Sequence, residues 1–238
     1  AGPAWKPLPV LLTTGLAPLG DAAPALWLVI ARAGGLLAVV MAFSLAARLC
    51  GGRGRWFAGA VAALGLLATV GFLRGLAGGS SEGLLAALLL LAVDRQLAGR
   101  SAQALGAGVA ASLLRPEVWP FLLAYAVWLW RRDPGSRPLV VTSLALLPLL
   151  WLLPELWGSG NLLRSSERAQ IPDPGQPALA ARPALEVLEG FATMVPFPVL
   201  LLALGTTALA LVRRERVPLV LAAGVGGWLA LVAVMAEA

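Results

Sequence analysis

Long apolar stretches, separated by short polar and charged ones, dominate the pattern of this sequence. The stretches are rich in leucine and alanine and lack the alternation of a strand, so each is predicted to form a helix. Spanning about 30 Å of hydrocarbon takes about 20 helical residues, because the backbone in lipid must satisfy its own hydrogen bonds. The pattern therefore predicts an all-α polytopic membrane protein with about eight transmembrane helices, several of them short. The expected segments are residues 24–49, 56–76, 81–93, 102–114, 118–130, 139–153, 191–212 and 218–235.

The same pattern divides the chain into two parts. Residues 1–23 form a proline-punctuated amphipathic segment, which is expected to lie along the outer membrane surface with Trp5 and Lys6 among the headgroups. Residues 24–238 are expected to form a single transmembrane helical domain. Its one long connection, the external loop 154–190, carries turn residues at 158–161 and 171–175 and is expected to end in a short helix. The chain starts without Met and ends in apolar residues, which indicates an internal part of a longer protein.

Composition agrees with a membrane protein and narrows the chemistry. Of the 238 residues, 59% are hydrophobic and 13% are charged, against about one half and one quarter in soluble domains. The sequence has no histidine, which excludes a Ser-His-Asp triad and histidine metal sites. Cys50 is the only cysteine, so an intramolecular disulfide and a cysteine metal cluster are excluded. We attribute the net charge of +6 to arginines on the cytoplasmic face, and no nucleic acid partner is expected.

Arginines concentrate in four short connections, which together hold eleven arginines and three acidic residues. These connections are residues 48–55, 94–100, 131–137 and 213–216. All four fall on one side of the membrane if the chain turns back at Arg115-Pro116-Glu117. One long helix over 102–130, kinked at Pro116, would place six of the arginines on the other side. Because basic loops stay cytoplasmic, we expect the hairpin, a multi-pass protein of the cell membrane, and an extracytoplasmic loop 154–190.

On this topology several charged side chains lie at the outer ends of helices, among them Lys6, Arg32, Glu82, Arg115 and Glu117. Charges near membrane depth are costly, so they indicate function or mutual pairing. Glu82 follows two glycines and two serines. It either caps the start of its helix or faces an external cavity, where it would bind a cation or a polar substrate. Arg115 either pairs with Glu117 and reaches toward the headgroups, or grips a phosphate through two parallel hydrogen bonds.

Five short motifs follow one another in a characteristic order. They are WKPLP at 5–9, ARAG at 31–34, GSSEGL at 79–84, LLRPE at 113–117 and WGSGN at 157–161. Their order resembles the GT-C class of integral-membrane glycosyltransferases, which take sugars from polyprenyl-phosphate donors on the outer face. The chain looks most like uncharacterised bacterial members of that class. The resemblance implies the membrane lipid and a polyprenyl-phosphate sugar donor as partners.

The resemblance also implies roles for individual residues. Glu82 would bind a divalent metal, Mg²⁺ or Mn²⁺, or the donor itself, and Arg32 and Arg115 would be cationic partners of the lipid phosphate. We add Lys6 and Glu117 to this substrate-binding set because they lie at the same outer helix ends. In this class an acidic residue of the first external loop is the general base. That loop would precede residue 1, so the catalytic residue is expected outside this chain and the fragment alone is expected to be inactive.

Two functions of other classes remain open on the sequence alone. A transporter or flippase would carry midplane polar groups, broken helices and duplicated halves, whereas this sequence has few midplane charges and no clear repeat. A non-catalytic membrane subunit would need polar residues only to satisfy helix ends. The donor sugar, the acceptor and the protein partners are not encoded in a readable motif.

Overall fold

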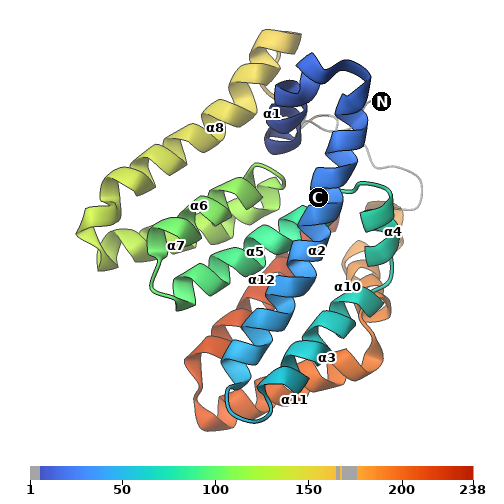
Figure 1. Cartoon of the computed structure of the whole chain (residues 1–238), viewed down its shortest axis with the longest axis vertical. Helices are drawn as coiled ribbons and strands as arrows, with labels where there is room; N and C mark the ends of the chain where they lie inside the picture. The colour runs from blue at the N-terminus through green and yellow to red at the C-terminus, as the bar shows by residue number, and fades with distance from the viewer. Residues whose placement is uncertain (1–5, 165–166, 168–175, 238) are drawn as a thin grey trace.

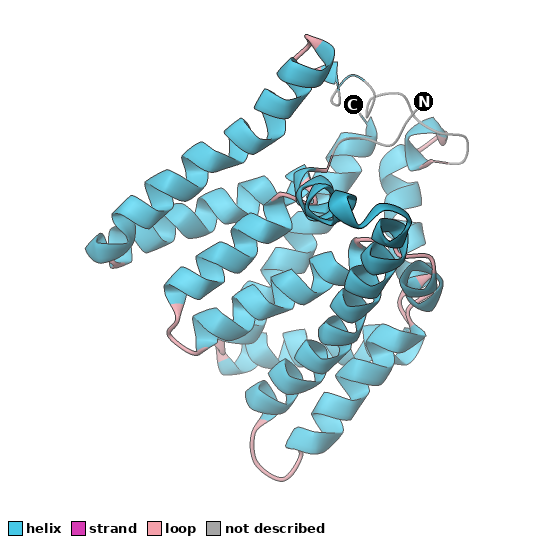
Figure 2. Cartoon of the chain, turned by 45° about the horizontal axis from the view of Figure 1, so that its top comes forward, coloured by secondary structure: helices cyan, strands magenta, loops and turns pink. Residues whose placement is uncertain are grey.

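A computed structural model describes residues 6–164, 167 and 176–237, and these residues are helical with no strand (Figure 1; Figure 2). The expectation of an all-α protein is confirmed. Trp5 and the turn residues 171–175 lie outside the described residues. The α-helices are α1 (Pro7–Leu16), α2 (Ala23–Cys50), α3 (Arg55–Ala68), α4 (Phe72–Ala77), α5 (Glu82–Leu97), α6 (Ser101–Ser112), α7 (Trp119–Arg132), α8 (Arg137–Ser159), α10 (Pro183–Met194), α11 (Phe197–Arg213) and α12 (Arg216–Glu237). The 3-10 helices are η1 (Ala17–Ala22), η2 (Pro116–Val118), η3 (Pro134–Ser136) and η4 (Pro177–Leu179).

Helix α2 lies between α3 and α5 and packs along both of them (Figure 1). It runs parallel to α5, because Gly35 meets Gly83 near the start of α5 while Arg48 donates to Asp94 near its end. The two glycines allow the helix backbones to approach closely, since neither carries a side chain into the contact.

Substitution of Gly83 tests this close contact. A Cβ atom on Gly83 would lie 2.7 Å from the Cα of Gly35, closer than real Cβ atoms approach backbone. We expect Gly83→Ala to lower the free energy of unfolding by about 1–3 kcal/mol, the usual cost of overpacking. The matched control is Gly106→Ala in α6, where an added Cβ atom would meet no neighbouring part of the structure within 4 Å and alanine gains up to about 1 kcal/mol of helix propensity. Thermal unfolding in detergent, followed by circular dichroism, compares the two. Equal stability of both variants would contradict the contact.

Helices α6 and α7 form the hairpin that the arginine distribution predicts. Leu122 of α7 lies against Gly108 of α6, and one turn farther along α7 the Tyr125 hydroxyl oxygen lies 3.3 Å from the carbonyl oxygen of Ser101. The two helices are therefore antiparallel, and the alternative of one kinked helix over 102–130 is wrong. The chain turns at Arg115, whose extended conformation (φ −144°, ψ 122°) follows from the proline after it, because a residue before proline is pushed out of the helical region.

The largest buried cluster joins the hairpin to α8. Its fully or almost fully buried side chains are Leu105, Leu113, Leu122, Ala126, Leu129, Val140 and Leu147. A second cluster lies where α5 and α6 meet the hairpin turn and contains Leu85, Ala111, Leu114 and Val118. Leu8 of α1 packs on both clusters, and its N–H donates to the carbonyl oxygen of Leu113 at 3.1 Å. The first turn of α1 is thereby held against the hairpin turn, which fixes the position of Lys6.

Three helical stretches are long and apolar enough to cross a membrane, and there are four if one bent pair of helices counts as a single span. The three are residues 7–50, 134–159 and 216–237, and the pair is α10 with α11. Helices α5, α6 and α7 have 16, 12 and 14 residues, or about 24, 18 and 21 Å at 1.5 Å per residue. These lengths fall short of the hydrocarbon core. The expectation of about eight transmembrane helices, several of them short, is therefore not supported, and three or four of the described helical stretches are candidate spans.

Two predicted segments are interrupted at residues that do not continue a helix. Segment 56–76 is divided at Gly71, whose φ of +84° lies outside the helical region, into α3 and α4. Segment 191–212 is divided at Val195 and Pro196, where α10 and α11 meet at a bend of 105°. Pro196 has no N–H to donate and disfavours the helical conformation of Val195.

The predicted external loop 154–190 is shorter than expected because helices extend into it from both sides. Helix α8 continues through Pro154 to Ser159, and α10 begins at Pro183. The short helix expected over 184–189 is confirmed as part of α10.

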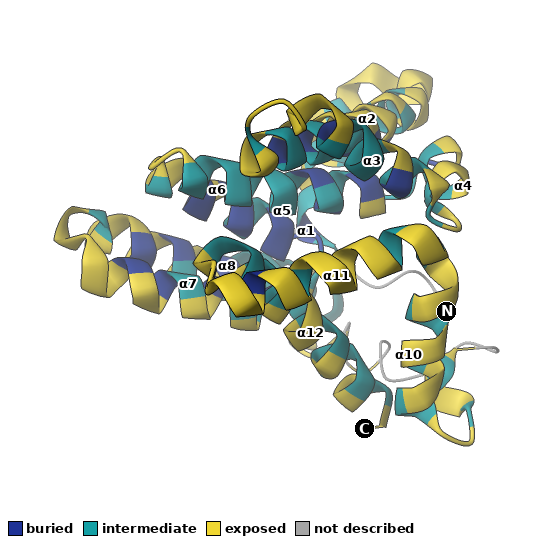
Figure 3. Ribbon diagram, turned by 90° about the horizontal axis from the view of Figure 1, so that it is seen from below, coloured by how far each residue is buried: buried dark blue, intermediate teal, exposed yellow. Residues whose placement is uncertain are grey.

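Helices α10 and α12 have no buried residue, α11 has one, and many apolar side chains of α11 are exposed, whereas buried residues gather where α2, α5, α6 and α7 pack (Figure 3). On α11, Phe197 is 68% exposed and Val212 is 83% exposed. Such an extended apolar surface is unusual for a soluble monomer. Together with the long apolar helices, it fits a location in the membrane.

Candidate functional site

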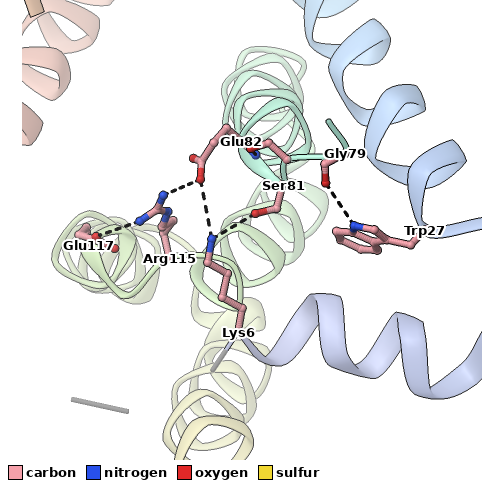
Figure 4. A network of polar contacts seen from close by, with 8 residues as sticks. Lys6, Trp27, Gly79, Ser81, Glu82, Arg115 and Glu117 are labelled. Atoms are coloured by element: carbon pink, nitrogen blue, oxygen red, sulfur yellow. Dashed lines mark hydrogen bonds and ion pairs between the residues drawn. The ribbon is translucent and has the colours of Figure 1, made fainter. Parts of the chain in front are cut away.

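Four of the five charged residues predicted for the site meet at one end of the helices, and we call Lys6, Glu82, Arg115 and Glu117 the ionic cluster (Figure 4). Arg115 Nη2 donates to Glu82 Oε1 at 2.5 Å, and its Nη1 lies 3.7 Å from Glu117 Oε1. Lys6 Nζ lies 3.8 Å from the same oxygen of Glu82 and donates to Ser81 Oγ at 3.3 Å. Two cations therefore converge on one carboxylate oxygen.

Three separate parts of the chain bring these side chains together. Lys6 immediately precedes α1, Glu82 begins α5, and Arg115 and Glu117 belong to the turn between α6 and α7. Leu114, next to Arg115, is 1% exposed and anchors that turn in the second core cluster. The ionic cluster is thus built on packed elements rather than on a free loop.

A tight turn before α5 sets the position of Glu82. Gly79 has a φ of +74°, and its carbonyl oxygen accepts a hydrogen bond from Trp27 Nε1 at 3.2 Å, which ties the turn to α2. Ser80 Oγ accepts from the N–H of Glu82 at 3.3 Å. Ser80 thus satisfies one free N–H at the start of α5, whereas the N-cap residue Ser81 forms no side-chain cap and the Glu82 side chain contacts the cations instead of the helix end.

Burial and neighbouring charges act differently on the two cations. Burial first, and then the charge of Arg115, lower the pKa of Lys6 below its usual value, and Glu82 and Glu117 offset this only in part. Burial also lowers the pKa of Arg115, but the hydrogen bond and charge of Glu82 outweigh it, so the net shift is upward. The guanidinium is firmly held by the carboxylate, whereas Lys6 is a cation that further negative charge would stabilise.

Glu117 brings an acceptor that the cluster does not use. Its side chain is 17% exposed, and its Oε2 atom is buried with no hydrogen-bond partner among the described residues. Leaving a buried acceptor unsatisfied costs about 1–3 kcal/mol. A ligand hydroxyl that donates a hydrogen bond to Glu117 Oε2 would remove this cost.

Arg32 is not in contact with the ionic cluster. Its Nη2 donates to the carbonyl oxygen of Ala77 at 3.0 Å, at the last residue of α4. It thus satisfies a helix end that would otherwise lack a partner.

Two residues that support the ionic cluster were not predicted from the sequence. They are Ser81, which accepts a hydrogen bond from Lys6, and Trp27, which holds the Gly79 turn. The only signal for Ser81 was its place beside Glu82.

The residues around Glu82 are a poor donor set for a divalent cation. Within the described part of the chain, no group of three acidic or cysteine side chains comes together as a metal site. Glu82 Oε1 already accepts from Arg115 and faces Lys6, and a metal there would meet two positive charges. Mg²⁺ needs several oxygen ligands in near-octahedral geometry. The described residues around Glu82 do not supply them, so they do not fit such a metal.

The arginine-rich connections lie away from the ionic cluster, at the other end of the helices they join. In Figure 1 the connections α2–α3 and α11–α12 lie at the bottom and the connections α5–α6 and α7–α8 at the left, whereas α1 lies at the top and α4 at the right. At the arginine-rich end Asp94 pairs with Arg48 at 2.7 Å and with Arg95 at 3.2 Å. The charged residues are therefore sorted to two ends of an apolar bundle.

Comparison with known proteins finds no matching family model, no matching curated protein and no matching solved structure.

Proposed function

We propose that the ionic cluster binds the phosphate of a polyprenyl-phosphate sugar, and that this chain is the transmembrane part of a glycosyltransferase acting at the outer leaflet. The convergence of Lys6 and Arg115 on one oxygen of Glu82 carries the proposal. Two cations that share one carboxylate oxygen are spaced to share one oxygen of a phosphate instead. The apolar helices around them supply the lipid-facing surface along which a polyprenyl chain would lie.

The chemistry follows from charge. In sugar transfer an acceptor oxygen bonds to the sugar carbon and gives its proton to the general base, while the bond between the sugar carbon and the phosphate oxygen breaks and negative charge grows on the departing phosphate. Lys6 and Arg115 would stabilise that charge, as preorganised cations do at developing oxyanions. To reach them, the phosphate displaces Glu82. The unpartnered Oε2 of Glu117 would accept a hydrogen bond from a sugar hydroxyl.

A transporter or flippase is the second candidate, and one observation favours it. The α10–α11 pair is a helix broken at Pro196 with a bend of 105°, and broken helices are typical of secondary transporters. A transporter would move the same lipid-linked sugar or another substrate across the membrane without breaking a bond.

Reconstitution of the full-length protein separates these functions. We expect proteoliposomes supplied with a radiolabelled polyprenyl-phosphate sugar to transfer the label to an acceptor or to water, and Arg115→Ala and Glu82→Ala to change the rate. Movement of intact lipid-linked sugar across the bilayer would replace the transferase by the flippase. Transfer at an unchanged rate in both variants would remove the ionic cluster as the site.

A further inference from the structure

Helix α7 has an exposed face that does not pack against the core and that runs from near the ionic cluster to the opposite, arginine-rich end of the helix. Leu122, Ala126 and Leu129 of α7 are buried against α6 and α8. On the opposite side an exposed stripe recurs at helical spacing and ends in arginine. The stripe consists of Pro120, Leu123, Ala124, Val127, Trp128 and Arg131.

The C-terminal part of this stripe lines an open cleft of about 470 Å³. Its lining residues are Ala124, Val127, Trp128, Arg131 and Arg132. All five lining residues belong to α7. The first three are apolar or aromatic and the last two are arginines, so this open surface is amphipathic along the helix.

Arg132 is held in position by a chain of contacts. Its guanidinium lies 5.6 Å from the ring centroid of Trp128, and Trp128 stacks on Tyr125 at 5.6 Å. The Tyr125 hydroxyl donates to Gln96 Oε1 at 2.5 Å, which ties this stack to α5. The cation–π contact therefore places the guanidinium at the rim before any ligand arrives.

Within the described residues, neither Arg131 nor Arg132 forms an ion pair. The nearest acid in sequence, Asp133, accepts instead from the Gly135 N–H at 3.0 Å and the Ser136 hydroxyl at 2.5 Å. The negative end of the α7 dipole, about half a charge, offsets only part of two guanidiniums. The rim is therefore positive and free to bind an anion.

We propose that this cleft binds an anionic phospholipid, with the phosphate on Arg131 and Arg132 and one acyl chain along the stripe. The length supports a lipid as the occupant. From Pro120 to Arg131 the stripe runs for about 16 Å at 1.5 Å per residue, and one leaflet is about 15 Å, half of the hydrocarbon core. A free phosphate would use only the rim. Basic pockets beside membrane helices are suited to such headgroups.

Native mass spectrometry of the purified protein tests this site. After exchange into phosphatidylglycerol or phosphatidylcholine, we expect wild type to retain one phosphatidylglycerol and no phosphatidylcholine. Arg131→Gln with Arg132→Gln should weaken this retention by about tenfold or more, because charge-assisted hydrogen bonds to phosphate are lost. Trp128→Leu should weaken it by about threefold, because the cation–π contact is lost.

Arg213→Gln with Arg214→Gln is the matched control, since it removes the same charge from the α11–α12 connection. We expect the control pair to retain phosphatidylglycerol as wild type does. If both double variants lost phosphatidylglycerol equally, the lipid would be held by the general positive charge of the arginine-rich end and not by the cleft, which would overturn the proposal. Displacement of the lipid by millimolar inorganic phosphate alone would overturn the role of the stripe. Unchanged melting temperatures in all variants ensure that retention, and not folding, is compared.

Discussion

Arg115→Gln should lower the affinity of the protein for a polyprenyl-phosphate sugar by about 10- to 100-fold. Arg115 is the cation that donates directly to Glu82, and a hydrogen bond to a charged group contributes about 1.5–3 kcal/mol. Glutamine keeps part of the side-chain volume but loses the charge and the bidentate geometry that phosphate prefers. Titration of the lipid into protein in nanodiscs, followed by tryptophan fluorescence, measures the change.

The matched control is Arg74→Gln on α4, which removes an exposed arginine without touching the ionic cluster. Its affinity should stay near that of wild type. Equal losses in the two variants would mean that overall charge, and not the cluster, attracts the lipid.

Glu82→Gln gives a further test of the same site, because, unlike Arg115→Gln, it is not expected to lower the affinity for the polyprenyl-phosphate sugar. Glu82 occupies the position between Lys6 and Arg115 that the phosphate would take, so its neutralisation should leave the affinity unchanged or raise it. A fall in affinity that depends on Mg²⁺ concentration would contradict displacement. It would favour instead the metal role that the family resemblance implies for Glu82.

Leu105→Ala should lower the free energy of unfolding by about 2–5 kcal/mol, the range for large-to-small substitutions in packed interiors. Leu105 is 0% exposed and lies in the cluster that joins α6, α7 and α8. The loss removes packing contacts and leaves a cavity that the three helices fill only in part. Leu202→Ala on α11, where the side chain is 53% exposed, should cost less than about 1 kcal/mol. Thermal melts in one detergent compare both, and a Leu202→Ala effect as large as that of Leu105→Ala would contradict the position of the core.

The sequence was sufficient to predict the hairpin, because the distribution of arginines depends on the direction of the chain. Turning back at Arg115 keeps all four basic connections at one end, and the structure has that turn. Glu82 and Arg115 were expected together for the same reason. Their direct ion pair depends on how α5 packs against the hairpin turn, and the distribution of charges along the sequence does not predict that packing.

The positions of helix breaks and helix ends could not be predicted from hydropathy, because they depend on single residues such as proline. The apolar character of 191–212 is continuous, yet Pro196 bends the chain within it. The reverse holds for α8, where Pro154 was taken as a boundary and the helix continues to Ser159. Arg32 was expected in the site because it is a charge within an apolar helix, but the carbonyl of Ala77, five residues before Glu82, takes its hydrogen bond instead.

Cysteine labelling tests the central claim, that the ionic cluster and the arginine-rich end lie on opposite sides of the membrane. Cys50 is the only cysteine, is exposed, and ends α2 beside the basic α2–α3 connection. Trp157 is 94% exposed near the end of α8. It lies six residues beyond Trp151, whose Nε1 donates to the carbonyl oxygen of Ser112 near the hairpin turn that carries Arg115. In intact cells a membrane-impermeant maleimide should leave Cys50 unlabelled until the membrane is permeabilised. It should label Trp157→Cys in a Cys50→Ser background at once. Labelling of Cys50 in intact cells, or labelling of both positions from the same side, would contradict the claim.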